Sequence, residues 1–145
     1  MHASHARPEL PLVVLPDRLA VARLEPSESV PAWAVASTVL SAVVRTAGEL
    51  SVLTIEGQVP EGARAERGYR ALMVREPLPF HLIGVLASMA EPLARAGISI
   101  FALSTFDTDY VLVKEPDLQR AVEVLREAGH VVESPPPAGS SPRAG

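Results

Sequence analysis

The chain has 145 residues, 48% of them hydrophobic, enough for one ordinary domain or two very small ones with a sizeable core. The net charge is −4 and no run of lysine or arginine is present, so the sequence shows no electrostatic signature of binding to nucleic acid or an anionic membrane. The absence of cysteine excludes disulfides, thiolate metal sites and a cysteine nucleophile. It fits a reducing compartment, and we expect a cytoplasmic protein.

The first half predicts short strands. Apolar, β-branched runs indicate strands at 19–24, 37–44 and 50–55, with a turn over 45–49. Residues 57–68 mix proline, glycine and charged residues, which predicts a linker or surface loop. This segment divides the chain into unequal halves.

The second half predicts a βαββαβ order from Tyr69 to Val132, which is the ferredoxin-like arrangement. A strand over 69–75 precedes a helix whose apolar residues recur at three- and four-residue spacing: Leu82, Val85, Leu86, Met89 and Leu93. Gly97 is placed to end that helix, and a hairpin with a polar tip follows over 97–113. A second helix begins after Glu115-Pro116-Asp117, ends at Gly129 and leads to a last short strand.

Two internal sequence similarities, called echoes below, support this order. Residues 93–100 and 125–132 both read as helix end, glycine cap and strand, 32 residues apart. A weaker echo pairs 49–53 with 109–113, so the first half is interpreted as a degenerate copy of the second.

We therefore predict an α+β fold in which an antiparallel sheet carries helices on one face. The expected division is a disordered N-terminus at 1–9, a degenerate half at 10–60, a linker at 61–68, a complete βαββαβ domain at 69–133 and a disordered, proline-rich tail at 134–145.

Three segments, 82–87, 93–100 and 104–113, resemble the ACT domain, a βαββαβ amino-acid-binding module of allosteric enzymes. The similarity is greatest to aspartate kinase regulatory domains and CASTOR-type amino-acid sensors, and the first half resembles the shorter ACT-like partner of tandem members. The resemblance implies a ferredoxin-like ACT fold and binding of a free amino acid or similar small molecule at an ACT-ACT interface.

By position, the resemblance implies ligand contacts from the loop before the first helix and from the hairpin: Phe80, His81, Leu82, Ile83, Gly84, Ser104, Thr105, Phe106, Asp107 and Asp109. Many ACT domains carry an acidic residue shortly before the loop glycine, whereas this chain has Pro79, Phe80 and His81 there. Recognition of a ligand amino group would then come from the hairpin.

The chemistry of these residues leaves alternatives open. Gly84 in the first turns of a helix costs about 1 kcal/mol relative to alanine, which indicates either approach of a ligand to the backbone amides or tight packing of helix on sheet. Asp107 and Asp109, if extended, share one strand face. Asp109 could bind an ammonium or guanidinium group, whereas Asp107 is equally well a solvated turn residue.

Other residue types give weaker signals. The four histidines have no metal-ligand spacing, His81 could line the pocket or stay exposed, and His130 is predicted simply to start a strand. Trp33 is interpreted as a packing residue between the halves. No nucleophile–base pair is evident, so we expect no enzyme, no cofactor and no metal.

The predicted function is a non-catalytic regulatory module that binds a small ligand and signals by domain orientation, as a homodimer or toward a separate regulated protein. The alternative is a ligand-free interaction or dimerisation domain that uses an exposed sheet edge.

Overall fold

The computed structural model describes residues 7–75 and 82–134, which form two compact units. The first unit contains the described residues 7–16, 71–75 and 82–134, and the second contains Asp17–Arg70. Strands β1 (Pro11–Leu24) and β4 (Ala65–Val74) contribute residues to both units. The second unit is therefore an insertion in the first, whereas the sequence suggested two halves in succession.

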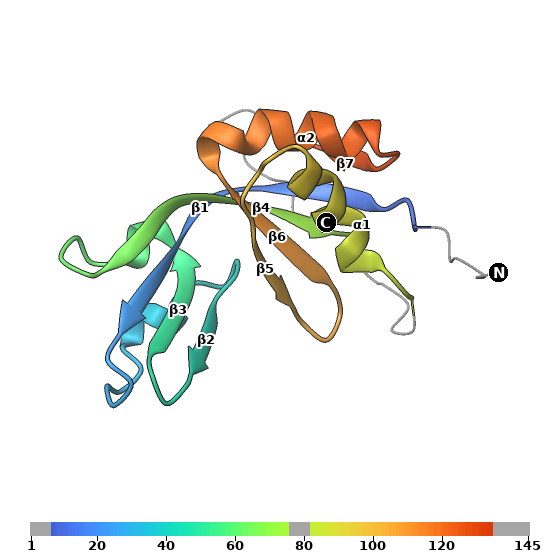
Figure 1. Cartoon of the computed structure of the whole chain (residues 1–145). Helices are drawn as coiled ribbons and strands as arrows, with labels where there is room; N and C mark the ends of the chain where they lie inside the picture. The colour runs from blue at the N-terminus through green and yellow to red at the C-terminus, as the bar shows by residue number, and fades with distance from the viewer. Residues whose placement is uncertain (1–6, 76–81, 135–145) are drawn as a thin grey trace. The chain divides into compact units, whose positions relative to one another are not determined.

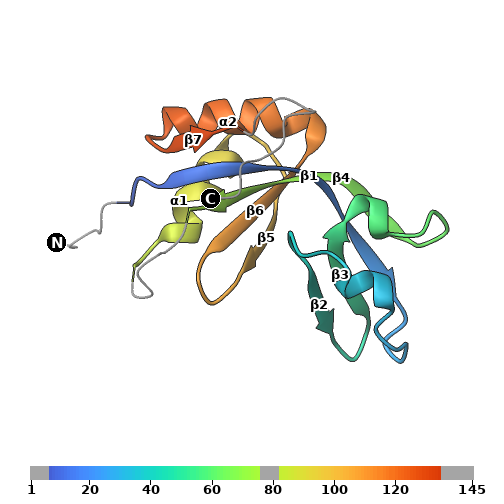
Figure 2. The same ribbon diagram turned by 180° about the vertical axis from the view of Figure 1, so that it is seen from behind.

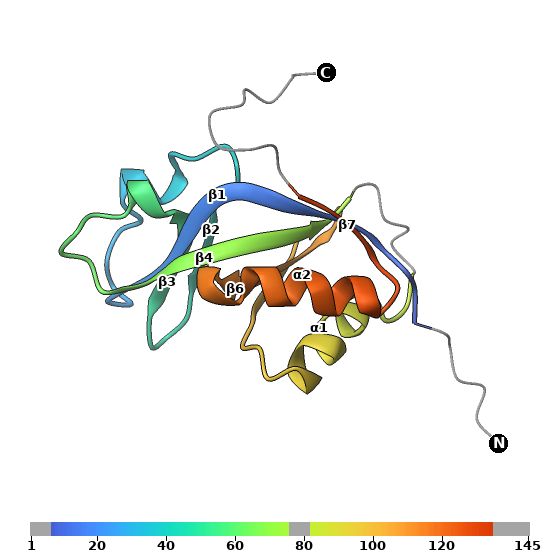
Figure 3. The ribbon, with the colours of Figure 1, turned by 90° about the horizontal axis from the view of Figure 1, so that it is seen from above.

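The first unit has the predicted βαββαβ order (Figure 1). After β4 come α1 (Val85–Arg95), the β5–β6 hairpin (Phe101–Ser104 and Asp109–Lys114), α2 (Leu118–Glu127) after the short 3₁₀ segment η3 (Glu115–Asp117), and β7 (Val131–Glu133). The unit has an α+β, ferredoxin-like fold, and Figure 3 shows its two helices side by side.

The start of β1 supplies a strand that the sequence did not predict. It lies between β7 and β4 in the strand order, pairing in parallel with β7 from Pro11 opposite Val131. On its other side, the amide of Arg75 donates to the carbonyl of Pro11 at 2.8 Å. The short apolar run 12–15, enclosed by two prolines, thus belongs to the sheet of the first unit.

Large aliphatic side chains fill the core of this unit. Its fully buried members come from both helices and the strands beneath them: Leu12, Leu72, Val74, Met89, Leu93, Val111, Val113 and Leu125. The predicted helical stripe is confirmed at Val85, Met89 and Leu93, but Leu82 precedes the helix and is 38% exposed.

Both α-helices end in the same hydrogen-bonded cap. After α1, the amide of Ile98 donates to Leu93 and that of Gly97 to Ala94; after α2, His130 and Gly129 repeat the pattern toward Leu125 and Arg126. Both glycines have positive φ, 75° and 103°, which other residues adopt at a cost. The 32-residue echo in the sequence is therefore a repeated helix–cap–strand unit.

The second unit repeats the element order in shortened form (Figure 2). Between the end of β1 and the start of β4 lie η1 (Ala32–Val35), β2 (Ala42–Arg45), β3 (Leu50–Ile55) and η2 (Glu56–Gln58). β3 pairs antiparallel with both β1 and β2. Single 3₁₀ segments take the positions that α-helices hold in the first unit, which fits the interpretation of this region as a degenerate ACT-like half.

Two element predictions in this unit were wrong. The strand expected over 37–44 is shorter and begins at Ala42. Residues 65–68, expected in a linker, instead begin β4 because they pair beside β1, where the amide of Arg23 donates to the carbonyl of Arg64 at 2.9 Å.

One core cluster of the second unit is built from small side chains, Ala20, Ala22, Ala34, Val52 and Val59. Leu19, Leu50 and Leu53 are buried in this unit as well. Trp33 is partly buried against this cluster, so it packs on its own unit's core. Within 7–75 and 82–134, no helix is long and apolar enough to cross a membrane.

Candidate functional site

The tip of the β5–β6 hairpin is a closed turn. Ser104 pairs with Asp109, and the amide of Thr105 donates to the carbonyl of Thr108 at 2.8 Å. The Thr108 amide donates in turn to Thr105 Oγ1 at 3.2 Å. The two threonines therefore satisfy each other's backbone groups, as hydroxyls near turns usually do.

Thr108 anchors this turn to the sheet. It is 3% exposed, and its hydroxyl donates to the carbonyl of Val74 at 2.6 Å. The turn presents Phe106, 84% exposed, and Asp107 to solvent, while Asp109 is half-buried at the start of β6. Because Asp107 lies in the turn and only Asp109 in a strand, the shared strand face expected of the two carboxylates is not formed.

The loop before α1 holds the other predicted residues. Phe80 and His81 lie outside the described residues, while Leu82 and Ile83 are exposed. Gly84 is the N-cap of α1, with φ 80° and ψ 17°, so it precedes the helix. A Cβ there would meet its nearest atom, Arg7 Nη1, at an ordinary 3.7 Å, so positive φ, more than crowding, explains the glycine.

The two segments predicted to bind the ligand contact different neighbours. The hairpin is tied to β4 through Thr108 and Val74, and Gly84 lies beside Arg7 and Pro8. Their union in one ligand site stays a prediction.

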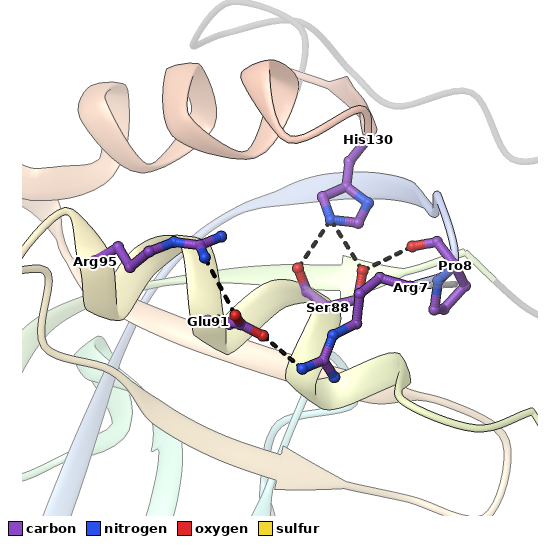
Figure 4. Close-up of polar contacts among 6 residues, drawn as sticks. All are labelled: Arg7, Pro8, Ser88, Glu91, Arg95 and His130. Carbon is purple, nitrogen blue, oxygen red and sulfur yellow. Dashed lines mark hydrogen bonds and ion pairs between the residues drawn. The ribbon is translucent and has the colours of Figure 1, made fainter. Parts of the chain in front are cut away.

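A buried polar cluster that the sequence analysis did not identify lies between the N-terminal segment, α1 and the start of β7 (Figure 4). His130 is 5% exposed, and its Nδ1 accepts a hydrogen bond from the Leu10 amide at 3.0 Å. Its Nε2 lies 3.0 Å from the carbonyl of Ser88 and 3.2 Å from the Ser88 hydroxyl. Since Nδ1 accepts, Nε2 carries the proton of the neutral ring and donates.

This tautomer decides what the Ser88–His130 pair can do. A base that activates serine must accept the hydroxyl proton at the facing nitrogen, but Nε2 already carries one. The Ser88 hydroxyl instead donates to the carbonyl of Pro8 at 2.7 Å. The arrangement joins three segments and is not arranged for nucleophilic catalysis.

Charged side chains surround a cavity of about 360 Å³ next to this cluster. Glu91 Oε2 pairs with Arg7 Nη2 at 2.6 Å, and Glu91 Oε1 pairs with Arg95 Nη1 at 3.2 Å. Residues 7–9, expected to be disordered, thus include Arg7 and Pro8 in contact with α1. One local signal could have found part of this cluster, because the glycine cap places His130 directly after α2. No local signal indicates its pairing with residues 42 and 120 positions away.

Comparison with known proteins agrees with this architecture. A family model described as "ACT domain" matches residues 64–127. Residues 64–127 are therefore an ACT domain. A second model, of an N-terminal domain, matches residues 17–62.

Proteins similar to this chain include a sensor and a regulatory subunit. The chain is 43% identical over 51 residues to the Homo sapiens protein named cytosolic arginine sensor for mTORC1 subunit 1, a match covering 35% of this chain and only 16% of the sensor. The regulatory subunit of aspartate kinase from Thermus thermophilus has a TM-score of 0.57 at 14% identity, with 81% and 96% of the two chains covered, which shows the fold alone.

A full-length structural match comes from a bacterial protein. Protein Atu0741 from Agobacterium tumefaciens has a TM-score of 0.85 and 32% identity, covering 92% of this chain and 99% of that one. A chain of almost the same extent therefore has a similar fold.

Proposed function

We propose that this ACT protein is a non-catalytic regulatory module that binds a free amino acid or a similar small molecule. The observation that carries the proposal is the hairpin tip, where Thr105 and Thr108 close the turn and Thr108 anchors it to Val74. This fixed turn holds the Asp109 carboxylate at the start of β6, half-buried, where it can bind a ligand ammonium or guanidinium group. The sequence likeness to an arginine sensor supports the same ligand class.

In this proposal the ligand lies between two ACT-like modules. It contacts the loop 80–84 of one module and the hairpin residues 104–107 and 109 of a neighbouring module, as in two copies of the first unit. A ligand that prefers one orientation of the modules shifts the population toward it, and a separate regulated protein, or a second copy in a homodimer, reads the change. A cytoplasmic location belongs to the same proposal.

Thermal unfolding against each of the twenty amino acids tests the proposal. A ligand at about 100 times its Kd adds roughly 2.7 kcal/mol to the folded state, which raises Tm by several degrees. We expect such a rise with one or two amino acids, and its loss in Asp109→Asn. Asp117→Asn, which removes the same charge in η3, is the matched control and should keep the response.

Two results would count against the proposal. No rise with any amino acid at millimolar concentration would reject this ligand class, and an unchanged rise in Asp109→Asn would remove Asp109 from the site.

The second candidate is a ligand-free interaction domain, and one observation favours it. In the second unit, Val44 is exposed on β2, the strand at one end of the order, and three exposed valines precede it in the sequence: Val30, Val35 and Val39. An edge strand with apolar side chains can pair with another chain. A dimer that forms without any response to amino acids would favour this candidate.

A further inference from the structure

We infer that the cavity beside α1 is a binding site for a small zwitterion, with the ligand carboxylate on Arg7 and Arg95 and its ammonium group on Glu91. This site is distinct from the hairpin of the proposed function, and it adjoins the loop only where Gly84 lies beside Arg7. It lies within the first unit, between residues 7–8, α1 and the end of α2 (Figure 4).

The size of the cavity fits a small molecule. Its volume of about 360 Å³ is many times the roughly 30 Å³ that one water molecule occupies in the liquid. It is also within the lower range of ligand pockets, roughly 300–1,000 Å³. A compact molecule with a handful of heavy atoms can therefore enter together with solvent.

The charges of the lining alternate in sign. Glu91 lies between two guanidinium groups, and each of its oxygens pairs with one of them. The group of three carries a net charge of +1 in a chain whose net charge is −4, so it attracts an anion. A bare anion would be repelled by Glu91, whereas a zwitterion places a positive group against it.

The two arginines retain capacity for a ligand. A guanidinium has five N–H donors, and each contact with Glu91 engages one Nη nitrogen. The Arg7 and Arg95 side chains are 55% and 71% exposed, so their remaining donors can turn toward a carboxylate at little desolvation cost. Their exposed ion pairs with Glu91 contribute little to stability, so exchanging one for a ligand contact costs little.

The floor of the cavity is held in place before any ligand arrives. Ser88 and His130 are almost fully buried, and their hydrogen bonds to Pro8 and Leu10 tie the N-terminal segment to α1 and β7. Arg7 directly precedes this tied segment, so its backbone is anchored beside α1. When a site is preformed in this way, less of the binding free energy is lost in ordering its side chains.

Two-dimensional NMR of the full chain, titrated with glycine, acetate or methylammonium at constant ionic strength, tests the inference. We expect millimolar glycine to shift the amide resonances of Ala87, Ser88 and Ala128, which line the cavity. Acetate should bind more weakly because it lacks the ammonium group, and methylammonium should bind weakest because the net charge is positive.

Charge-removing variants provide the controls. Arg7→Gln and Arg95→Gln should each weaken glycine binding by about fivefold or more, because each removes a charge-assisted hydrogen bond. Arg120→Gln removes the same charge from an exposed position of α2 outside the cavity and should bind as the parent chain does.

The inference is overturned if glycine leaves the cavity amides unmoved, if both arginine variants bind it normally, or if acetate binds as well as glycine. Shifts confined to residues 105–109 and abolished by Asp109→Asn would instead support the hairpin site alone. The two proposals can therefore fail separately.

Discussion

The two units share one order of elements but differ in what covers their strands. The first unit has α-helices of 11 and 10 residues, whereas the second has 3₁₀ segments of 4 and 3 residues at the corresponding places. The clusters that these segments cover differ in the same sense. Leucine, valine and methionine dominate the cluster of the first unit, whereas the cluster that contains Ala34 of η1 has three alanines and two valines, although the second unit also buries Leu19 and Leu50. We infer that the small side chains of this cluster leave less depth to cover, so the single short turn of η1 suffices where the first unit needs a helix.

The largest expected effect tests the deeper core. Leu93→Ala removes a fully buried side chain of α1 and should lower the free energy of unfolding by about 2–5 kcal/mol, from lost burial and the cavity left behind. Urea unfolding measures the loss. Val131→Ala, at a position 65% exposed, is the control and should change stability by less than about 0.5 kcal/mol.

The same experiment on the second unit sharpens the comparison. Val52→Ala removes a smaller side chain from the alanine-rich cluster, so the loss of unfolding free energy should be clearly smaller than for Leu93→Ala. Equal costs would contradict the explanation that core depth decides the length of the covering segment.

A second prediction concerns the strand that the first unit gains from the start of β1. His130→Ala leaves the buried amide of Leu10 and the carbonyl of Ser88 without their ring partners, which should cost about 2–4 kcal/mol. Hydrogen exchange at the Leu10 amide should also be faster in His130→Ala. Ser88→Ala removes only the hydrogen bonds of the hydroxyl, so it should lower the free energy of unfolding by less. If hydrogen exchange at the Leu10 amide is equally slow in both variants, His130 does not hold this segment.

The sequence predicted the elements whose signals are local. The α1 stripe of Val85, Met89 and Leu93 and the caps at Gly97 and Gly129 follow from helical spacing and positive φ, both readable within a dozen residues. The ACT fold then followed from the order of these elements and from the resemblance.

What the sequence did not predict depends on contacts between distant residues. The start of β1 becomes a strand because it pairs with Val131 and Arg75, and neither partner can be inferred from a short apolar run between prolines. The polar cluster joins Leu10, Ser88 and His130 in the same non-local way. Phe80 and His81 of the predicted site lie outside the described residues, so that part of the site stays a prediction.

The smallest expected effect is a gain in stability in the second unit. Thr54 lies in β3 opposite Ala20, is fully buried, and its hydroxyl finds no hydrogen-bond partner among the described residues. Thr54→Val keeps the shape of the side chain and removes the unsatisfied oxygen, so the free energy of unfolding should rise by about 1 kcal/mol. Thr38→Val, at an exposed position of the same unit, is the control and should leave it nearly unchanged. A loss of stability in Thr54→Val would mean that the hydroxyl is satisfied in solution, for instance by a bound water, and that the alanine-rich core is wetter than its side chains indicate.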